Sequence, residues 1–407
     1  MKFNRHNSLM TITFLLVSAF NSHAQDWPQW RGANHDGHVS GFIAPERWPD
    51  GLTKSWDVVV GSGDATPALV DGRLYTFSRQ ESKEITRCLN TENGVELWRN
   101  EYDSIEIKGG ARSHSGPRSS PAVVHGKVVT IGVAGVLTCL NAESGEVVWR
   151  KDEFPGEYSD YYTSASPLIV ENTCVAQLGG NKAGAIIAYN LDDGSEVWRW
   201  EGDPPAYASP TVLTVEGRNQ IVALTDQNLV GISATDGKLL WQVPFPVPRM
   251  STNSATPVVL GQTVIYSAQK RGVHAVRVEI VEDGYRATPL WSNEKLSTAF
   301  NTPVGFSNLL FGLSDRTHLY CLDAMTGAVL WTDEARHERF GSIVYTESAL
   351  FALPSNGVLT IYEPSGTHYS RLAQYPISDS PTYAHPVVSG DRVYIQDQNT
   401  VTAWAFR

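Results

Sequence analysis

The chain has 407 residues, of which 42% are hydrophobic and 18% charged, and this is the composition of an ordinary globular protein. Its 32 Lys and Arg against 43 Asp and Glu give a formal net charge of -11. A chain this acidic has no general attraction for phosphate backbones or anionic lipid, so we expect no nucleic-acid partner.

Residues 1–24 have the pattern of a secretory signal peptide. Basic residues precede an apolar run from Met10 to Phe20, and small residues end at Ala24, so we expect cleavage before Gln25. The run is too short for a permanent membrane span. No cysteine lies near the cleavage point to carry a lipid. We therefore expect an exported protein, periplasmic or extracellular, that does not span the membrane and is a monomer.

A lead-in segment, residues 25–48, precedes what we interpret as a single domain, residues 49–407. The lead-in contains His35, Asp36 and His38, whose imidazole and carboxylate groups are good metal ligands. Polar residues of this kind in a Gly-rich loop are more typical of solvated turns. We therefore predict no metal site here.

A Gly followed four residues later by Trp recurs along the chain at intervals of about 40 to 50 residues. An Asn or Asp lies four residues before the Gly in most copies, where its side chain closes a tight turn. The pattern predicts a strand, a turn and a strand that carries a Trp. Because an indole buries a large area, we expect these residues to dock between repeat units. The copies end at Trp98, Trp149, Trp198, Trp241 and Trp331, with a looser one at Trp291.

A second repeated element opens each unit, and it consists of Ser, Thr or His followed by Pro and a short apolar run. Proline has no N–H to donate, so it suits the first residue of a strand. A turn and a β-rich run follow in most copies, so each unit predicts four strands. The openings are at Pro67, Pro121, Pro167, Pro210, Pro257, Pro303 and Pro386, with an eighth that lacks Pro at Gly341 to Tyr345.

Four-stranded units at this spacing are typical of propeller blades. We predict an all-β fold, an eight-bladed β-propeller of four-stranded antiparallel blades. The last unit lacks a Trp strand, and the segment around Trp56 has the matching pattern. We therefore expect an N-terminal strand to complete the last blade and close the ring. The segment from Asp333 to Arg339 is the one stretch for which we expect a helical turn.

The four cysteines do not form a disulfide framework. Cys88, Cys139 and Cys321 occupy the same position in different units, too far apart for a disulfide. No CxxC or Cys/His spacing points to a metal. We predict that these three and Cys174 are free thiols.

The blade pattern, as in Leu322 to Trp331, resembles the tryptophan-docking repeat of the pyrroloquinoline-quinone-like propellers. That superfamily includes the quinoprotein alcohol dehydrogenases and BamB, a subunit of the outer-membrane β-barrel assembly machinery. The lead-in from Asp26 to Gly32 is similar to the start of many exported bacterial propellers of this type.

The resemblance implies a site in the dehydrogenases that this sequence does not reproduce. Those enzymes hold their quinone on the propeller axis beneath a disulfide of adjacent cysteines, beside a metal ion and a catalytic Asp. This chain has no adjacent cysteine pair and lacks the long insertions that build that site. We therefore expect no catalytic residues and no cofactor. The leading hypothesis is a non-catalytic, BamB-like binding or scaffold propeller, which acts through its loop faces and channel mouth. Two alternatives stay open: an oxidoreductase that uses the quinone with calcium, and a propeller that binds or processes polysaccharides.

The residues just before each inner strand should ring one mouth of the central channel. This set contains Arg, Tyr, Asn and His and no carboxylate, so it would suit an anionic or aromatic ligand, unless the Arg side chains pair with loop carboxylates. Besides a ligand, we expect protein partners. The predicted ligand-binding residues are Arg118, Tyr162, Tyr207, Asn253, Asn301, Arg339, Tyr383 and His385.

Overall fold

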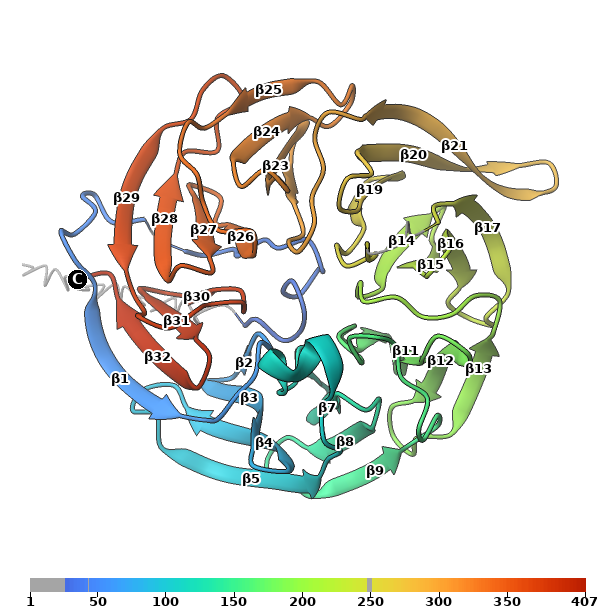
Figure 1. Cartoon of the computed structure of the whole chain (residues 1–407), viewed down its shortest axis with the longest axis horizontal. Coiled ribbons are helices and arrows are strands. Elements are labelled where there is room, and N and C mark those ends of the chain that lie inside the picture. The colour runs from blue at the N-terminus through green and yellow to red at the C-terminus, as the bar shows by residue number, and fades with distance from the viewer. Residues whose placement is uncertain (1–25, 43, 247–250) are drawn as a thin grey trace, which may run out of the picture.

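The computed structural model describes residues 26–42, 44–246 and 251–407. They form eight four-stranded antiparallel sheets arranged as blades around a central axis (Figure 1). The predicted all-β, eight-bladed propeller is therefore confirmed. The predicted signal peptide lies outside the described residues. Within the described ranges, no helix is long and apolar enough to cross a membrane.

The first four blades follow one another along the chain, and the innermost strand comes first in each. Blade 1 contains β2 (Ala68–Val70), β3 (Arg73–Gln80), β4 (Lys83–Asn90) and β5 (Glu96–Asp103); blade 2 contains β6 (Ala122–Val124), β7 (Lys127–Ile131), β8 (Leu137–Asn141) and β9 (Val147–Lys151); blade 3 contains β10 (Leu168–Val170), β11 (Thr173–Gly179), β12 (Gly184–Asn190) and β13 (Glu196–Trp200); blade 4 contains β14 (Thr211–Val215), β15 (Arg218–Leu224), β16 (Asn228–Ser233) and β17 (Leu239–Pro244).

The remaining four blades complete the circle. Blade 5 contains β18 (Val258–Leu260), β19 (Thr263–Ser267), β20 (Val273–Val281) and β21 (Gly284–Asn293); blade 6 contains β22 (Val304–Phe306), β23 (Leu309–Leu313), β24 (Leu319–Asp323) and β25 (Val329–Thr332); blade 7 contains β26 (Gly341–Tyr345), β27 (Leu350–Pro354), β28 (Val358–Tyr362) and β29 (Arg371–Pro376); blade 8 contains β30 (Val387–Ser389), β31 (Arg392–Gln396), β32 (Thr400–Ala405) and β1 (Thr53–Val59).

The N-terminal strand closes the ring as predicted. β1 pairs antiparallel with β32, from Thr53 opposite Ala405 to Val59 opposite Thr400. Trp56 in this strand is buried, and its indole N–H donates to the carbonyl of Thr91 in blade 1 at 2.9 Å. The outer strand of blade 8 is thus tied to the first blade, and neither end of the sheet series is left as an open edge.

The repeated Gly and Trp form the contact between neighbouring blades. The indole N–H of Trp149 donates to the carbonyl of Leu191 in blade 3 at 3.0 Å, and its ring packs on Gly194. Gly194 has a φ of 70°, and a Cβ there would lie 2.7 Å from the indole ring. Only Gly fits a position that needs both a left-handed backbone and this close approach. Trp56, Trp98, Trp198, Trp291 and Trp331 also donate to a carbonyl of the following blade.

Trp241 departs from this pattern because blade 5 offers no matching turn. The hairpin of β20 and β21 is long and projects beyond the ring (Figure 1). The indole N–H of Trp241 donates instead to Gln220 of its own blade at 2.6 Å. The predicted docking residue Trp241 is buried, whereas Trp98 is only partly buried.

A second set of contacts joins the blades near the axis, and it explains the repeated Ser or Thr before Pro. The hydroxyl oxygen of Ser120 accepts the backbone N–H of Thr66 in the preceding blade at 3.0 Å. Ser166 and Ser209 accept from Ser120 and Ser166 in the same way, each at 2.9 Å. Blades are therefore linked at the inner strands as well as at the outer ones.

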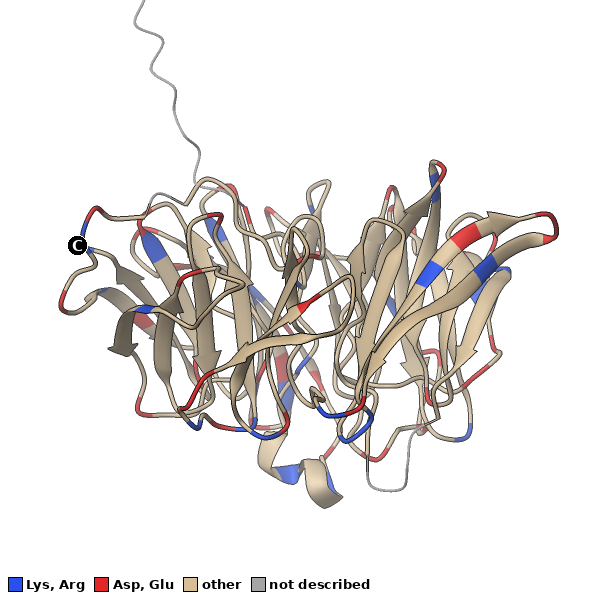
Figure 2. Ribbon diagram, turned by 90° about the horizontal axis from the view of Figure 1, so that it is seen from above, with Lys and Arg blue, Asp and Glu red and all other residues tan. Residues whose placement is uncertain are grey.

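The helical turn predicted between Asp333 and Arg339 is wrong. Residues 333–339 form a loop, because the carboxylate of Asp333 accepts the backbone N–H of Leu319 and contacts the imidazole of His337. The helix of the described chain is instead the 3-10 helix η1 (Gly109–His114), which projects from one face of the ring (Figure 2).

All four cysteines are free and buried, as predicted. Burial raises the pKa of Cys88 to about 11 and that of Cys139 to about 12, so neither forms a thiolate at neutral pH. Cysteine-specific labelling of the folded protein at pH 8 should therefore be slow. After unfolding without reductant, a thiol titration should find four reactive groups; a count of two would mean a disulfide.

The docking contact also predicts a stability change. Trp149→Ala removes a buried indole that contacts the next blade, so it should cost about 3 to 5 kcal/mol of unfolding free energy. The adjacent Val148 is 42% exposed, so Val148→Ala should change the free energy by less than about 0.5 kcal/mol. Urea unfolding followed by circular dichroism measures both. Equal transition midpoints for the two variants would contradict the docking role.

Candidate functional site

The two faces of the ring differ in what they carry. One face, here called the linker face, carries the connections between successive blades, including η1, and the turns between each second and third strand. The opposite face, the turn face, carries the short turn after each innermost strand and the Asn or Asp turns before the Trp strands. Because each inner strand begins at the linker face, the residues before it converge there around the axis.

A cavity of about 870 Å³ opens at this mouth, and we call it the funnel. Of the eight predicted ligand-binding residues, the structure brings seven to its lining: Arg118, Tyr207, Asn253, Asn301, Arg339, Tyr383 and His385. Tyr162 lies elsewhere. It is buried beside Ile107 and Ala111, and its hydroxyl accepts the backbone N–H of Lys108 at 3.1 Å.

The lead-in closes the channel below the funnel. Its chain crosses the middle of the ring before passing to the edge where β1 begins (Figure 1). The backbone of Trp27 pairs with Leu69 of blade 1, and that of Val39 donates to Tyr345 of blade 7 at 2.7 Å. Between them, Arg31 is fully buried and donates to the carbonyls of Thr302 and Pro303. The funnel is therefore a blind cavity rather than an open pore.

The side chains of Trp30 and His385 contact each other at the end of the funnel nearest the lead-in. The indole N–H of Trp30 donates to the hydroxyl of Thr256 at 2.9 Å. The two rings lie with their centroids 4.5 Å apart, and both line the cavity. Sequence reasoning missed Trp30 because the lead-in has no repeat that would place it on the axis.

Aromatic side chains form much of the wall. The rings of Phe300 and Phe340 stack with centroids 4.6 Å apart, and Tyr383 packs edge-on against Phe340. On the other side, Tyr161 and Tyr207 form a T-shaped pair, with Tyr161 49% exposed. These faces offer flat apolar area beside polar groups, a combination found in sites for ring-shaped ligands.

The two Arg side chains of the mouth do not pair with carboxylates in the described part of the chain. Arg118 donates to the carbonyls of Tyr161 and His114, at 2.6 and 2.8 Å. Arg339 is exposed, and its guanidinium lies 4.7 Å from the centre of the Phe300 ring. Neither forms an ion pair with a described residue, so the alternative in which both pair with loop carboxylates does not describe this mouth.

Three carboxylates that the sequence-based set did not include also line the funnel. Asp64 contacts Nδ1 of His114 at 2.9 Å, and this hydrogen bond raises the pKa of His114. Asp160 accepts from Asn181, and Asp226 from Gln227. Together they offset the charge of the two Arg, so the part of the lining that the structure describes is not cationic.

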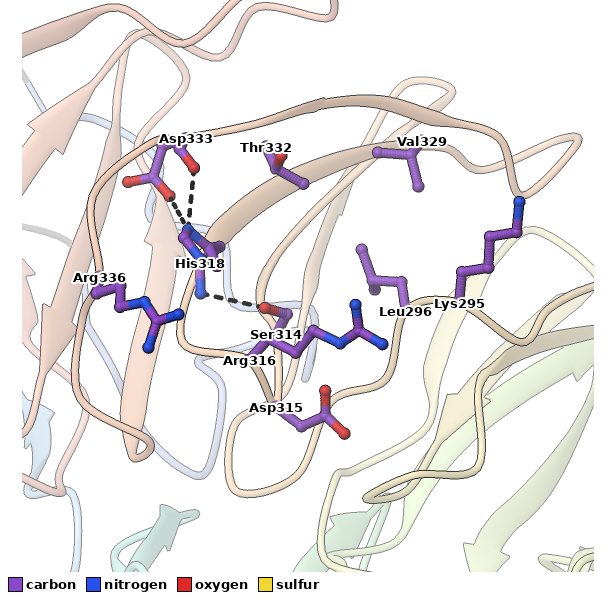
Figure 3. A pocket seen from close by; sticks show the side chains of 10 residues that line it. All are labelled: Lys295, Leu296, Ser314, Asp315, Arg316, His318, Val329, Thr332, Asp333 and Arg336. Carbon is purple, nitrogen blue, oxygen red and sulfur yellow. Dashed lines mark hydrogen bonds and ion pairs between the residues drawn. The ribbon is translucent and has the colours of Figure 1, made fainter.

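A second pocket of about 580 Å³ lies on the linker face between blades 5 and 6 (Figure 3). Ser314, His318 and Asp333 meet there, but they do not form a nucleophilic triad. The hydroxyl of Ser314 accepts the backbone N–H of His318, not a proton from its ring. Nδ1 of His318 lies 3.0 Å from the backbone carbonyl of Asp333 and 3.7 Å from its carboxylate. The arrangement supports no acyl-transfer chemistry.

The residues present do not fit a quinone site of the dehydrogenase kind. No cysteine lines the funnel, and the four cysteines lie inside blades. Among the residues that the structure describes, no group of three or more His, Cys, Asp or Glu is placed to hold a metal ion. We therefore derive no step through such a cofactor.

Comparisons with known proteins agree with this fold. The family model described as "Outer membrane protein assembly factor BamB" matches residues 81–333. The chain is 22% identical over 363 residues to the BamB of Shewanella oneidensis, a match that covers 85% of this chain and 86% of that one. It is 27% identical over 161 residues to a quinohemoprotein alcohol dehydrogenase of Pseudomonas putida, covering 38% of this chain and 22% of that one.

Two solved structures show the same fold. The crystal structure of BamB from Moraxella catarrhalis has a TM-score of 0.64 at 17% identity and covers 88% of this chain and 98% of its own. The quinohemoprotein alcohol dehydrogenase from Comamonas testosteroni has a TM-score of 0.68 at 15% identity and covers 94% of this chain and 80% of its own. Because an assembly factor and an alcohol dehydrogenase share this architecture, these likenesses show the fold and not an activity.

His385 predicts a pH dependence of stability. Burial lowers its pKa to about 3, against an ordinary value of 6.5. Between these values the unfolded chain is protonated at this position and the folded chain is not, so His385 destabilises the fold as the pH falls through that range. His385→Ser should remove this contribution.

Urea unfolding at pH 7 and pH 4.5 measures the effect. The parent should lose more stability between the two than His385→Ser does. His368→Ser, which changes an exposed His, should behave like the parent. An identical loss in the parent and His385→Ser would contradict a neutral, buried imidazole.

Proposed function

The chain belongs to the family described as outer membrane protein assembly factor BamB, and from this membership we propose that it is an exported assembly factor that binds protein partners and catalyses no reaction. The observation that carries the proposal is the extent of the match. BamB relatives align over most of this chain, whereas the dehydrogenase of Pseudomonas putida aligns over 38% of it. The lack of a fitting quinone site in the funnel supports the same choice.

The partner surface that we propose is the linker face. The connections between blades on this face are longer than the turns after the innermost strands on the opposite face, and η1 projects from it (Figure 2). Lys108 and Arg112, beside and within this helix, are exposed, and so is Tyr161 at the rim of the funnel. Exposed aromatic and Arg side chains on a rigid scaffold are the residue types enriched at protein interfaces.

The funnel residues belong to this proposal as a second contact. Arg118, Tyr207, Asn253, Asn301, Arg339, Tyr383 and His385 would meet whatever enters the mouth, whether a partner segment or a small ligand. We propose that the protein acts in the periplasm, close to the outer membrane, because its relatives are named outer membrane protein assembly factors.

Deletion of the gene in its host tests the proposal. We expect lower amounts of folded β-barrel proteins in the outer membrane, restored by the parent gene. Complementation with Lys108→Glu/Arg112→Glu should fail to restore them, because charge reversal beside and within η1 disturbs the proposed surface. Quantitative mass spectrometry of outer-membrane fractions is the measurement.

A matched control is available on the opposite face. Arg218 is exposed at the start of β15, next to the turn between the first two strands of blade 4, so Arg218→Glu should complement fully. Unchanged outer-membrane proteins in the deletion strain would refute an assembly role. Full complementation by the η1 variant would move the partner surface away from this helix.

A further inference from the structure

One position on the axis breaks the repeat. The residue before the Pro of each inner strand is Ser or Thr in six of the seven blades that have this Pro, and it is His385 in blade 8. The backbone N–H of His385 still donates to the hydroxyl of Thr66 at 2.9 Å, as the inter-blade contact requires. Its side chain, however, turns to Trp30 and lines the funnel. The backbone role is thus kept while an imidazole replaces a hydroxyl.

The imidazole carries an unsatisfied polar atom. His385 is 3% exposed, and its Nδ1 has no hydrogen-bond partner among the described residues. A buried polar atom without a partner costs stability, so such atoms are expected where a ligand completes the hydrogen bond. Because the ring is neutral, it suits an uncharged group such as a hydroxyl, which both donates and accepts.

Hydroxyls in other parts of the funnel lining offer the same chemistry. The oxygens of Ser166 and Ser209 accept backbone N–H groups, which leaves the hydrogen of each hydroxyl to donate. Both side chains line the funnel. A ligand that meets these hydroxyls and His385 must carry several oxygen atoms.

The shape and charge of the funnel narrow the class of ligand further. The funnel combines the indole of Trp30 with the walls of Phe340, Tyr383 and Tyr207, and these provide flat faces for stacking. Among the described residues, the three carboxylates of the funnel offset the two Arg, so a small anion gains little from them as a group. The volume of about 870 Å³ is large enough for more than one six-membered ring.

From this lining we propose that the funnel is a saccharide-binding site for the end of a neutral oligosaccharide. A sugar ring stacks on Trp30, and one of its hydroxyls bonds to Nδ1 of His385. The carboxylates of the mouth then bond to the remaining hydroxyls. This inference rests on the proposed second contact at the mouth and names its ligand; binding to the purified chain tests it, whereas the deletion strain tests the assembly role.

Titration calorimetry on the purified mature chain tests the site. The probes are four neutral tetrasaccharides, of β1,4-glucose, α1,4-glucose, β1,3-glucose and β1,4-N-acetylglucosamine, with inorganic phosphate and citrate as anionic probes. At least one sugar should bind with a Kd of about 1 mM or tighter. No binding of any sugar, or binding of the anions alone, overturns the proposal.

Variants of the funnel lining test whether the sugar binds in the funnel. His385→Ser restores the residue type of the other blades, so it should fold, and loss of one hydrogen bond should weaken binding by about threefold to tenfold. Tyr383→Ala removes a wall and should weaken binding as well. His368→Ser, outside the funnel, should bind like the parent. Sugar binding that His385→Ser and Tyr383→Ala leave unchanged would place the ligand elsewhere and overturn the proposal.

Discussion

The contact between an outer-strand tryptophan and the next blade sets the geometry of this protein. Each contact combines a packed indole with one N–H to carbonyl bond, as for Trp149 and Leu191. A four-stranded blade cannot bury both faces by itself, so its neighbour must lie at one angle and one height. Six blades make this contact with the next one, and the circle closes where Trp56 of blade 8 bonds to blade 1.

The funnel is a consequence of this closed circle. Because inner strands start at the same level, the residues that precede them meet at one mouth although they are far apart in the chain. The inner hydroxyl contacts, such as Ser120 with Thr66, hold these starts in register. A rigid ring of this kind positions side chains from eight blades around one axis, which explains how the architecture supports both assembly factors and alcohol dehydrogenases.

The lead-in adds side chains to the axis that the blade repeat does not supply. Arg31 is held by four carbonyl oxygens, two from the lead-in and two from blade 6, and this fixes the adjoining Trp30 below the mouth. The segment thereby converts a channel into a blind cavity. The lead-in residues of the site lie outside the blade repeat. His385 occupies a repeat position, but it replaces the hydroxyl residue found there in other blades.

The sequence by itself determined the blades, their number, the closing strand around Trp56 and the free cysteines. It also placed at the mouth seven of the eight residues that it predicted there. These features recur with the repeat, and a periodic pattern places residues in space without knowledge of distant contacts. Only the tertiary structure decided the rest. Tyr162 packs beneath η1, Trp241 turns to its own blade, and Trp30 and Asp64 enter the funnel. Their positions depend on packing between segments remote in sequence, which leaves no periodic trace in the chain.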